Sequence, residues 1–180
     1  MLFLATLIGL ESCRKMHKII ITGPESSGKT TLCEALSQHF NIPFSKEYAR
    51  KYLYSLNRDY NQSDLLKIAK GQLQGEANKQ LIDTDLITIK IWSNYKYGHC
   101  DNWILEQIKK QTIEKRFYLL CKPDIKWEAD PLRENPINRM DLFELYKKEL
   151  KILRHDYYII KGNNRIDNAI SKTLSQNFLV

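Results

Sequence analysis

The sequence predicts a three-layer α/β fold, in which helices flank a mostly parallel central sheet. An apolar, β-branched run at 18–22 leads into a glycine-containing loop at 23–30, and a helix-compatible run follows at once. Further short apolar runs at 117–121 and 156–160 are separated by longer amphipathic stretches, as in successive βαβ units. A parallel sheet gathers the carboxyl ends of its strands at one edge, where we expect ligands to bind.

The loop Gly-Pro-Glu-Ser-Ser-Gly-Lys-Thr at 23–30 matches the phosphate-loop pattern G-x-x-x-x-G-K-[ST] without a mismatch. Its backbone N–H groups and the following helix N-terminus favour bound phosphate, so we expect a P-loop NTPase fold that binds ATP. Lys29 should reach the β- and γ-phosphates, and the Thr30 hydroxyl should bind Mg²⁺. A chance glycine-rich turn before a helix is the alternative. The predicted nucleotide contacts in this segment are Gly23, Glu25, Ser26, Ser27, Gly28, Lys29, Thr30 and Thr31.

Length and composition indicate a single cytoplasmic domain. The chain has 180 residues and a formal net charge of +7, but its basic residues are mixed with acidic ones rather than gathered in a block. We therefore expect no nucleic-acid partner. The cysteines show neither C-x-x-C spacing nor neighbouring histidines, which argues against a zinc site or a disulfide framework. The sequence leaves homo-oligomer formation open.

The first ten residues are apolar, yet no basic residue precedes them and the run is too short to span a bilayer. We expect residues 1–16 to be a leader outside the fold, with no membrane segment, and residues 17–180 to form the P-loop domain. Met16 lies just before the first strand and could start a complete domain.

After the loop, the pattern predicts a helix at 29–40, a short strand at 42–45 and a second helix from Lys46. Glu47 and Arg50 then lie just beyond the carboxyl end of a strand, at the expected ligand edge. Glu47 is a candidate for the group that orients or deprotonates an acceptor hydroxyl. Alternatively, it is an exposed acidic residue favoured by the helix dipole.

A helix capped by Ser63 and reaching about residue 79 leads to a strand at 80–85 that ends in carboxylates. In an extended chain Asp83 and Asp85 share one face. We expect Asp83 to bind Mg²⁺, directly or through water, and Asp85 to meet the substrate or its hydroxyl. Alternatively, Asp85 only caps the helix that begins at Leu86.

The polar, proline-broken segment 127–139 is predicted to be a lid. Its Arg133 and Arg139 could close over the phosphates and stabilise the charge of phosphoryl transfer. Alternatively, these arginines pair with nearby acidic residues in a solvated loop. A helix at 140–154, a strand at 156–162 and a last helix at 166–179 follow, and Arg165 could stack on adenine.

The remaining signals discriminate among proteins with a phosphate loop. A GTPase needs D-x-x-G after the metal-binding strand, and residues 83–86 are Asp-Thr-Asp-Leu. A ring-forming ATPase needs a helical domain beyond the core, for which we expect no room. A small core with an arginine-bearing lid favours a small-molecule kinase.

Several motifs together resemble the ribosylnicotinamide kinase domain of the bifunctional NAD-salvage proteins, from about residue 18 onward. They are the loop at 23–30, Glu-Tyr-Ala-Arg at 47–50, Lys-Gly-Gln at 70–72, Leu-Ile-Asp-Thr-Asp at 81–85 and Asp-Pro-Leu-Arg at 130–133. The adenylyltransferase signature H-x-G-H of the bifunctional members is absent, so the resemblance implies a kinase alone.

The resemblance implies transfer of the ATP γ-phosphate to the 5′-hydroxyl of nicotinamide riboside. The nicotinamide ring of this acceptor is cationic, so it suits an aromatic and acidic pocket. The candidate substrate contacts are Glu47, Tyr48, Arg50, Asp85, Trp92, Tyr95 and Trp127. Glu47, Asp83 and Asp85 remain alternatives for the base, with Glu47 favoured. A kinase for another nucleoside or nucleotide, or an ATPase that regulates a protein partner, is the alternative function.

Overall fold

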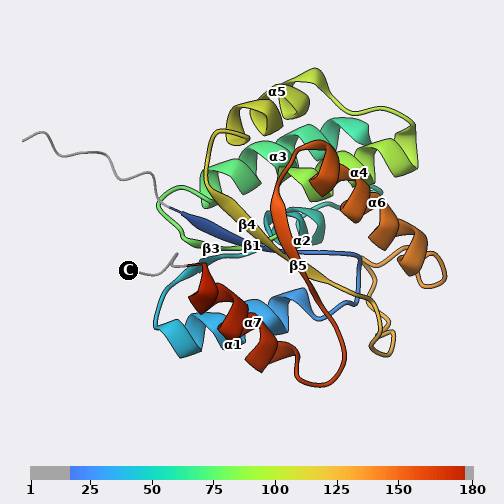
Figure 1. Cartoon of the computed structure of the whole chain (residues 1–180). Coiled ribbons are helices and arrows are strands. Elements are labelled where there is room, and N and C mark those ends of the chain that lie inside the picture. Colours follow the sequence, from blue (N-terminus) through green and yellow to red (C-terminus); the bar gives the residue numbers. More distant parts are fainter. Residues whose placement is uncertain (1–16, 177–180) are drawn as a thin grey trace, which may run out of the picture.

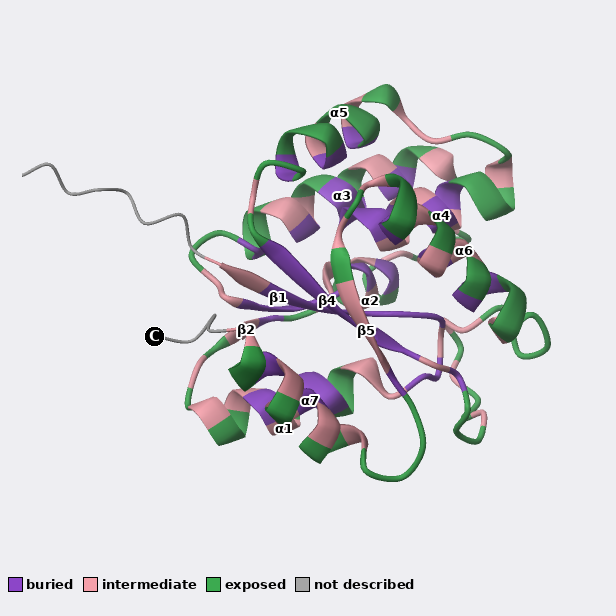
Figure 2. Cartoon of the chain, in the orientation of Figure 1, coloured by how far each residue is buried: buried purple, intermediate pink, exposed green. Residues whose placement is uncertain are grey.

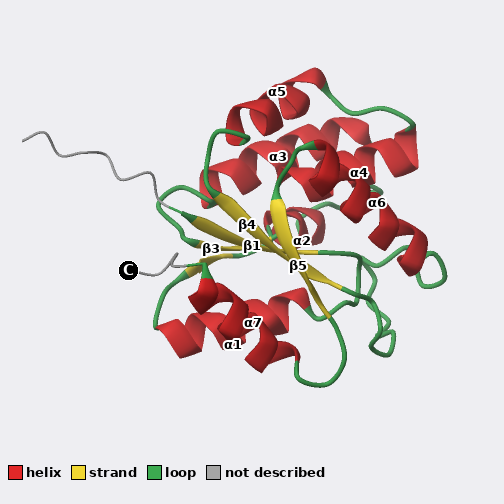
Figure 3. Ribbon diagram, viewed as in Figure 1, coloured by secondary structure: helices red, strands yellow, loops and turns green. Residues whose placement is uncertain are grey.

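The computed structural model describes residues 17–176, so the predicted leader at 1–16 lies outside the described residues. Five parallel strands form one sheet in the order β2-β3-β1-β4-β5 (Figures 1 and 3). The strands are β1 (Lys18–Thr22), β2 (Phe44–Ser45), β3 (Leu81–Asp83), β4 (Arg116–Cys121) and β5 (Asp156–Ile160). The central strand β1 leads directly into the phosphate loop, which therefore lies at the carboxyl edge of the sheet.

Helices cover both faces of the sheet, which gives the predicted three layers. Two helices, α1 and α7, lie on one face, and the others lie on the opposite side (Figure 1). The helices are α1 (Lys29–Phe40), α2 (Tyr48–Tyr54), α3 (Gln62–Gly75), α4 (Leu86–Tyr97), α5 (Asn102–Gln111), α6 (Arg139–Ile152) and α7 (Arg165–Ser175). None of the helices within residues 17–176 combines the length and apolar character needed to cross a bilayer.

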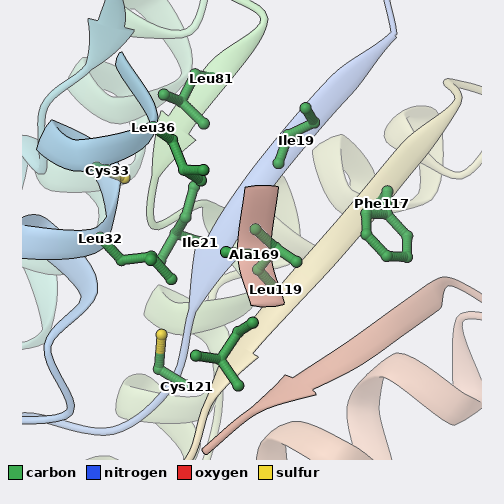
Figure 4. Close-up of a cluster of buried hydrophobic side chains, with 11 residues drawn as sticks. Ile19, Ile21, Leu32, Cys33, Leu36, Leu81, Phe117, Leu119, Cys121 and Ala169 are labelled. Carbon is green, nitrogen blue, oxygen red and sulfur yellow. The ribbon is translucent and has the colours of Figure 1, made fainter. Parts of the chain in front are cut away.

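The alternation of side chains along β1 divides the core between the two faces. Ile19 and Ile21 join the cluster under α1 and α7, where Leu36 of α1 and Ala169 of α7 meet the sheet (Figure 4). Ile20 points the other way and packs with residues of α4 and α6. Strands β1, β3 and β4 are buried almost throughout (Figure 2), which explains their largely apolar sequence. The edge strand β5 is exposed at Asp156 and only partly buried up to Ile159.

The structure confirms the sheet and the first helix and corrects several boundaries. Helix α3 ends at Gly75 rather than near residue 79, and strand β3 covers Leu81–Asp83 rather than 80–85. Strand β2 covers only Phe44–Ser45, because the Ile42 N–H is used to end α1, donating to Ser37 O at 3.1 Å. Helix α3 is capped by Asn61 rather than Ser63. Asn61 Oδ1 accepts the Ser63 N–H at 3.0 Å, and Asp64 Oδ2 accepts the Asn61 N–H at 2.9 Å, a complete capping box.

Candidate nucleotide and acceptor site

The phosphate loop curls between β1 and α1 as its glycines predict. Gly23 has φ of 139°, and a Cβ added there would lie 2.5 Å from Cys121 O of the neighbouring strand. Ser27 Oγ donates to Pro24 O at 2.7 Å, and Lys29 Nζ donates to the same carbonyl at 2.8 Å. The loop therefore holds itself curled, with its lysine inside the turn where phosphate oxygens would sit.

Thr30 and Asp83 are brought together as predicted. The Thr30 hydroxyl donates to Asp83 Oδ2 at 2.7 Å, although 53 positions separate the two residues. Asp83 is buried, and its Oδ1 has no hydrogen-bond partner among the described residues. Burial and, second, the negative charge of Glu47 raise the pKa of Asp83 to about 6, against the opposing charge of Lys29.

An unpartnered carboxylate oxygen beside a threonine hydroxyl fits Mg²⁺, which takes hard oxygen ligands and completes its shell with water and phosphate. Within residues 17–176, no cluster of three or more His, Cys, Asp or Glu side chains forms a metal site by itself. The Thr30–Asp83 pair could therefore hold a metal only together with a bound nucleotide.

A pocket extends from the phosphate loop to the helices α2, α4 and α6. Glu47 lines it just before α2, and its side chain makes no capping hydrogen bond. On α4, Trp92 and Tyr95 line the same pocket. The predicted site residues that line it are Gly23, Glu25, Ser26, Ser27, Gly28, Lys29, Thr30, Thr31, Glu47, Arg50, Trp92, Tyr95 and Arg133.

The segment between β4 and α6 lies against the phosphate loop. Glu25 Oε2 accepts the backbone N–H groups of Glu134 and Asn135 at 2.9 and 3.0 Å. Arg133 Nη1 lies 3.4 Å from Ser26 Oγ, and Arg139 Nη1 donates to Ser26 O at 3.0 Å. Both predicted lid arginines thus contact the phosphate loop.

Asp85 is the main correction to the predicted site. Thr84 has φ of 63°, so the chain leaves the extended conformation and Asp85 does not share a face with Asp83. The Asp85 carboxylate is fully buried, and its Oδ2 accepts bonds from two residues of β4, Arg116 at 3.0 Å and Tyr118 at 2.7 Å. Its Oδ1 accepts the Ile87 N–H at 3.1 Å, so Asp85 caps α4 and its oxygens are already paired.

Three other predicted contacts lie away from the pocket wall. The Tyr48 ring packs against Gly71 of α3. Trp127 lies under two guanidinium groups, with Arg139 Cζ 5.5 Å and Arg133 Cζ 6.0 Å from its ring centroid. Arg165 approaches the outside of the phosphate loop and donates to Ser27 O at 2.7 Å while pairing with Asp124.

The pocket also contains residues that sequence reasoning missed. Thr88 of α4 and Tyr146 of α6 line it, and both are polar groups on otherwise apolar helix faces. Thr88 Oγ1 lies 3.2 Å from Thr22 Oγ1 at the end of β1. The only sequence signal was a polar residue within an apolar stripe, which is common in helices that have no site.

A five-stranded parallel sheet, a phosphate loop at its central strand and a Thr30–Asp83 pair define a P-loop nucleotide-binding domain. The model of a family described as an AAA domain matches residues 18–165, and the chain belongs to this family.

The chain also resembles a curated protein of NAD metabolism. The trifunctional NAD biosynthesis/regulator protein NadR of Escherichia coli K12 is 33% identical over 129 residues, which span 66% of this chain and 31% of that protein. The chain therefore spans about a third of this curated relative.

Two solved structures share the fold. One is a NadR protein in complex with NR, with a TM-score of 0.70 and 23% identity over 89% of this chain and 51% of that chain. The other is a NadR protein with NAD and AMP-PNP, with a TM-score of 0.65 and 20% identity over 92% of this chain and 51% of that chain.

Proposed function

We propose that this domain is a cytoplasmic, Mg²⁺-dependent kinase that transfers the ATP γ-phosphate to the 5′-hydroxyl of nicotinamide riboside. The observation that carries the proposal is that the phosphate loop, Glu47 and the aromatic residues of α4 all line the same pocket. The name of the E. coli relative and the NR bound in a similar structure support this acceptor. A domain that only hydrolyses ATP has no need of an acceptor pocket.

On the nucleotide side, the phosphate loop binds the triphosphate and Lys29 exchanges its bond to Pro24 O for phosphate oxygens. Thr30 and Asp83 would hold Mg²⁺, which neutralises charge on the β- and γ-phosphates. Arg165 lies beside Gly28 and Ile125, where we propose that it contacts the adenine ring.

On the acceptor side, Glu47 orients the hydroxyl and accepts its proton. The hydroxyl oxygen forms a bond to the γ-phosphorus as the bond from that phosphorus to the bridging oxygen breaks, and ADP leaves. Glu47 suits this role because it lines the same pocket as Lys29 and Thr30 of the phosphate loop. Its negative charge also contributes to the raised pKa of the Asp83 carboxyl.

The cationic nicotinamide ring would lie against Trp92 and Tyr95, whose π faces attract positive charge. Arg133 and Arg139 already contact Ser26 of the loop, so small side-chain movements would bring them to the transferred phosphate. The Glu25 carboxylate holds this segment in place through backbone N–H groups.

The test is incubation of the protein with Mg²⁺, ATP and a panel of nucleosides that includes nicotinamide riboside, read by mass spectrometry. We expect a product heavier by one phosphoryl group from nicotinamide riboside and none with Lys29→Ala. A phosphorylated product from another nucleoside alone would reassign the acceptor. ATP hydrolysis with no phosphorylated nucleoside would contradict the proposal and favour an ATPase that regulates a partner.

A further inference from the structure

Gln72 of α3 is a buried amide, 1% exposed, that joins two segments of the site. Its Oε1 accepts the Tyr48 N–H at 2.8 Å. Its Nε2 donates to Thr84 O at 2.8 Å and lies 3.4 Å from Asp83 O. Because one side of the amide faces an N–H and the other faces carbonyl oxygens, its orientation is unambiguous.

The two segments held by Gln72 carry the two carboxylates of the proposed reaction. Tyr48 directly follows Glu47, and Thr84 directly follows Asp83. The amide therefore ties the backbone next to the proposed base to the backbone next to the proposed metal ligand. The link between the two segments is thus made by a side chain of a third element, α3.

Gln72 also explains why the Glu47 side chain is available to the pocket. The first N–H groups of a helix have no acceptor within the helix, and a residue at the N-cap often satisfies one with its side chain. Glu47 is at the N-cap of α2 but makes no such bond, whereas Gln72 accepts the N–H of Tyr48 from outside the helix. Part of the capping role is thus taken by α3.

The neighbouring Gly71 makes this approach of α2 to α3 sterically possible. A Cβ at position 71 would lie 2.3 Å from Tyr48 Cε1 and 2.4 Å from Tyr48 Cζ, far inside van der Waals contact. At the other end, Thr84 has a left-handed φ of 63°, which costs energy for a β-branched residue. Bonds from Thr84 N to Ile21 O at 2.9 Å and from Gln72 to Thr84 O hold that turn.

We propose that Gln72 is a positioning residue that fixes the Glu47 carboxylate relative to Asp83, and that Gly71 admits the Tyr48 ring needed for this geometry. The inference rests on the kinase function proposed above. Small errors in the placement of reacting groups lower rates strongly, so loss of the link should lower the rate of transfer more than nucleotide binding.

The test compares Gln72→Met with Gln111→Met. Gln111 is the matched control because it is also a buried glutamine, 5% exposed, but it contacts Glu76 away from the pocket. For Gln72→Met we expect kcat for nucleoside phosphorylation to fall by about 10- to 100-fold, with the KM for MgATP within about 3-fold of wild type. Gln111→Met should keep the wild-type kcat.

A second measurement does not depend on activity. Hydrogen exchange of the Tyr48 amide in the nucleotide-free protein should accelerate at least about 10-fold in Gln72→Met and stay unchanged in Gln111→Met. If Gln72→Met does not fold, Gly71→Ala replaces it. Alanine favours the helix, yet it should displace the Tyr48 ring and lower kcat.

The outcomes separate this inference from the proposed function. Equal kcat values for the two glutamine variants, or an unchanged Tyr48 exchange rate in Gln72→Met, would overturn the positioning role. If the wild-type protein phosphorylates no nucleoside, the proposed function fails on its own. A crystal structure of Gln72→Met then decides, because Glu47 displaced relative to Asp83 supports the inference and an unmoved Glu47 overturns it.

Discussion

Asp83 and Asp85 are two positions apart, yet they belong to regions with opposite character. Asp83 is bonded to Thr30 of the pocket wall, with one oxygen unpartnered among the described residues and a raised pKa. Asp85 lies in a buried ion cluster, in which Arg116 also pairs with Glu76 at 2.6 Å. The positive φ of Thr84 sends the two side chains in different directions.

The comparison shows how burial can serve either reactivity or stability. A buried carboxylate that lacks partners is costly to ionise, and a bound cation relieves that cost. A buried carboxylate whose oxygens are all paired is stable in place and is unavailable for chemistry. The first description fits Asp83 and the second fits Asp85.

Asp83→Asn gives the largest expected effect. Transfer should fall by about three orders of magnitude because the metal loses its charged ligand. The metal-free variant should be at least as stable as wild type at pH 7, since ionised Asp83 destabilises the fold above its raised pKa of about 6. Steady-state kinetics and thermal unfolding without nucleotide check both parts. A strongly lowered Tm would place Asp83 among the structural carboxylates instead.

Asp85→Asn should show the reverse pattern. Removing one charge of a fully buried pair leaves Arg116 less compensated and should lower the free energy of unfolding by about 3 kcal/mol. The folded protein should keep its kcat within about 3-fold, because Asn can still cap α4. Urea unfolding, with activity assayed at low temperature, measures the two quantities. A hundredfold loss of kcat in stably folded protein would restore Asp85 as a candidate base.

Glu47→Gln extends the comparison to the third carboxylate. We expect kcat to fall by about 100-fold while the KM for nicotinamide riboside changes little, because the amide can still bind a hydroxyl but cannot accept its proton. Initial rates over a range of acceptor concentrations separate the two constants. A change confined to KM would make Glu47 a binding residue and leave the base unassigned.

His155 gives the smallest expected effect and tests the buried cluster. Its ring lies 5.0 Å from that of Tyr118, and burial, aided by the charge of Arg116 and opposed by Asp85 and Asp156, lowers the pKa of His155. The stability that this lowered pKa contributes is present above the ordinary value of 6.5 and is lost as pH falls below it. His155→Gln should therefore flatten the fall in Tm between pH 7 and 5 by a few degrees.

The control for that measurement is His39→Gln, on the exposed end of α1. It should leave the slope of Tm against pH as in wild type. An identical slope in wild type and His155→Gln would show that protonation of His155 is not coupled to folding.

The parts of the site that were predictable are those written in short, local patterns. The phosphate loop, the span of α1 and the place of Glu47 just beyond β2 all follow from spacing within about ten residues. The prediction of an extended chain through Asp85 was wrong, because no local sequence pattern predicts the left-handed conformation of Thr84. The packing of the Tyr48 ring on Gly71 could not be predicted, because Gly71 lies on another helix.

The sequence by itself determined the class of fold, the phosphate-binding loop and the pairing of Thr30 with a carboxylate after a strand, because these depend on periodicity and on the chemistry of one segment. Tertiary structure alone decided which of two neighbouring aspartates bonds to Thr30 of the phosphate loop, that Arg116 compensates the other, and that Gln72 ties the two halves of the site together. Those partners are distant in sequence, and only the packing of α2, α3 and β4 around β3 brings them within hydrogen-bonding distance.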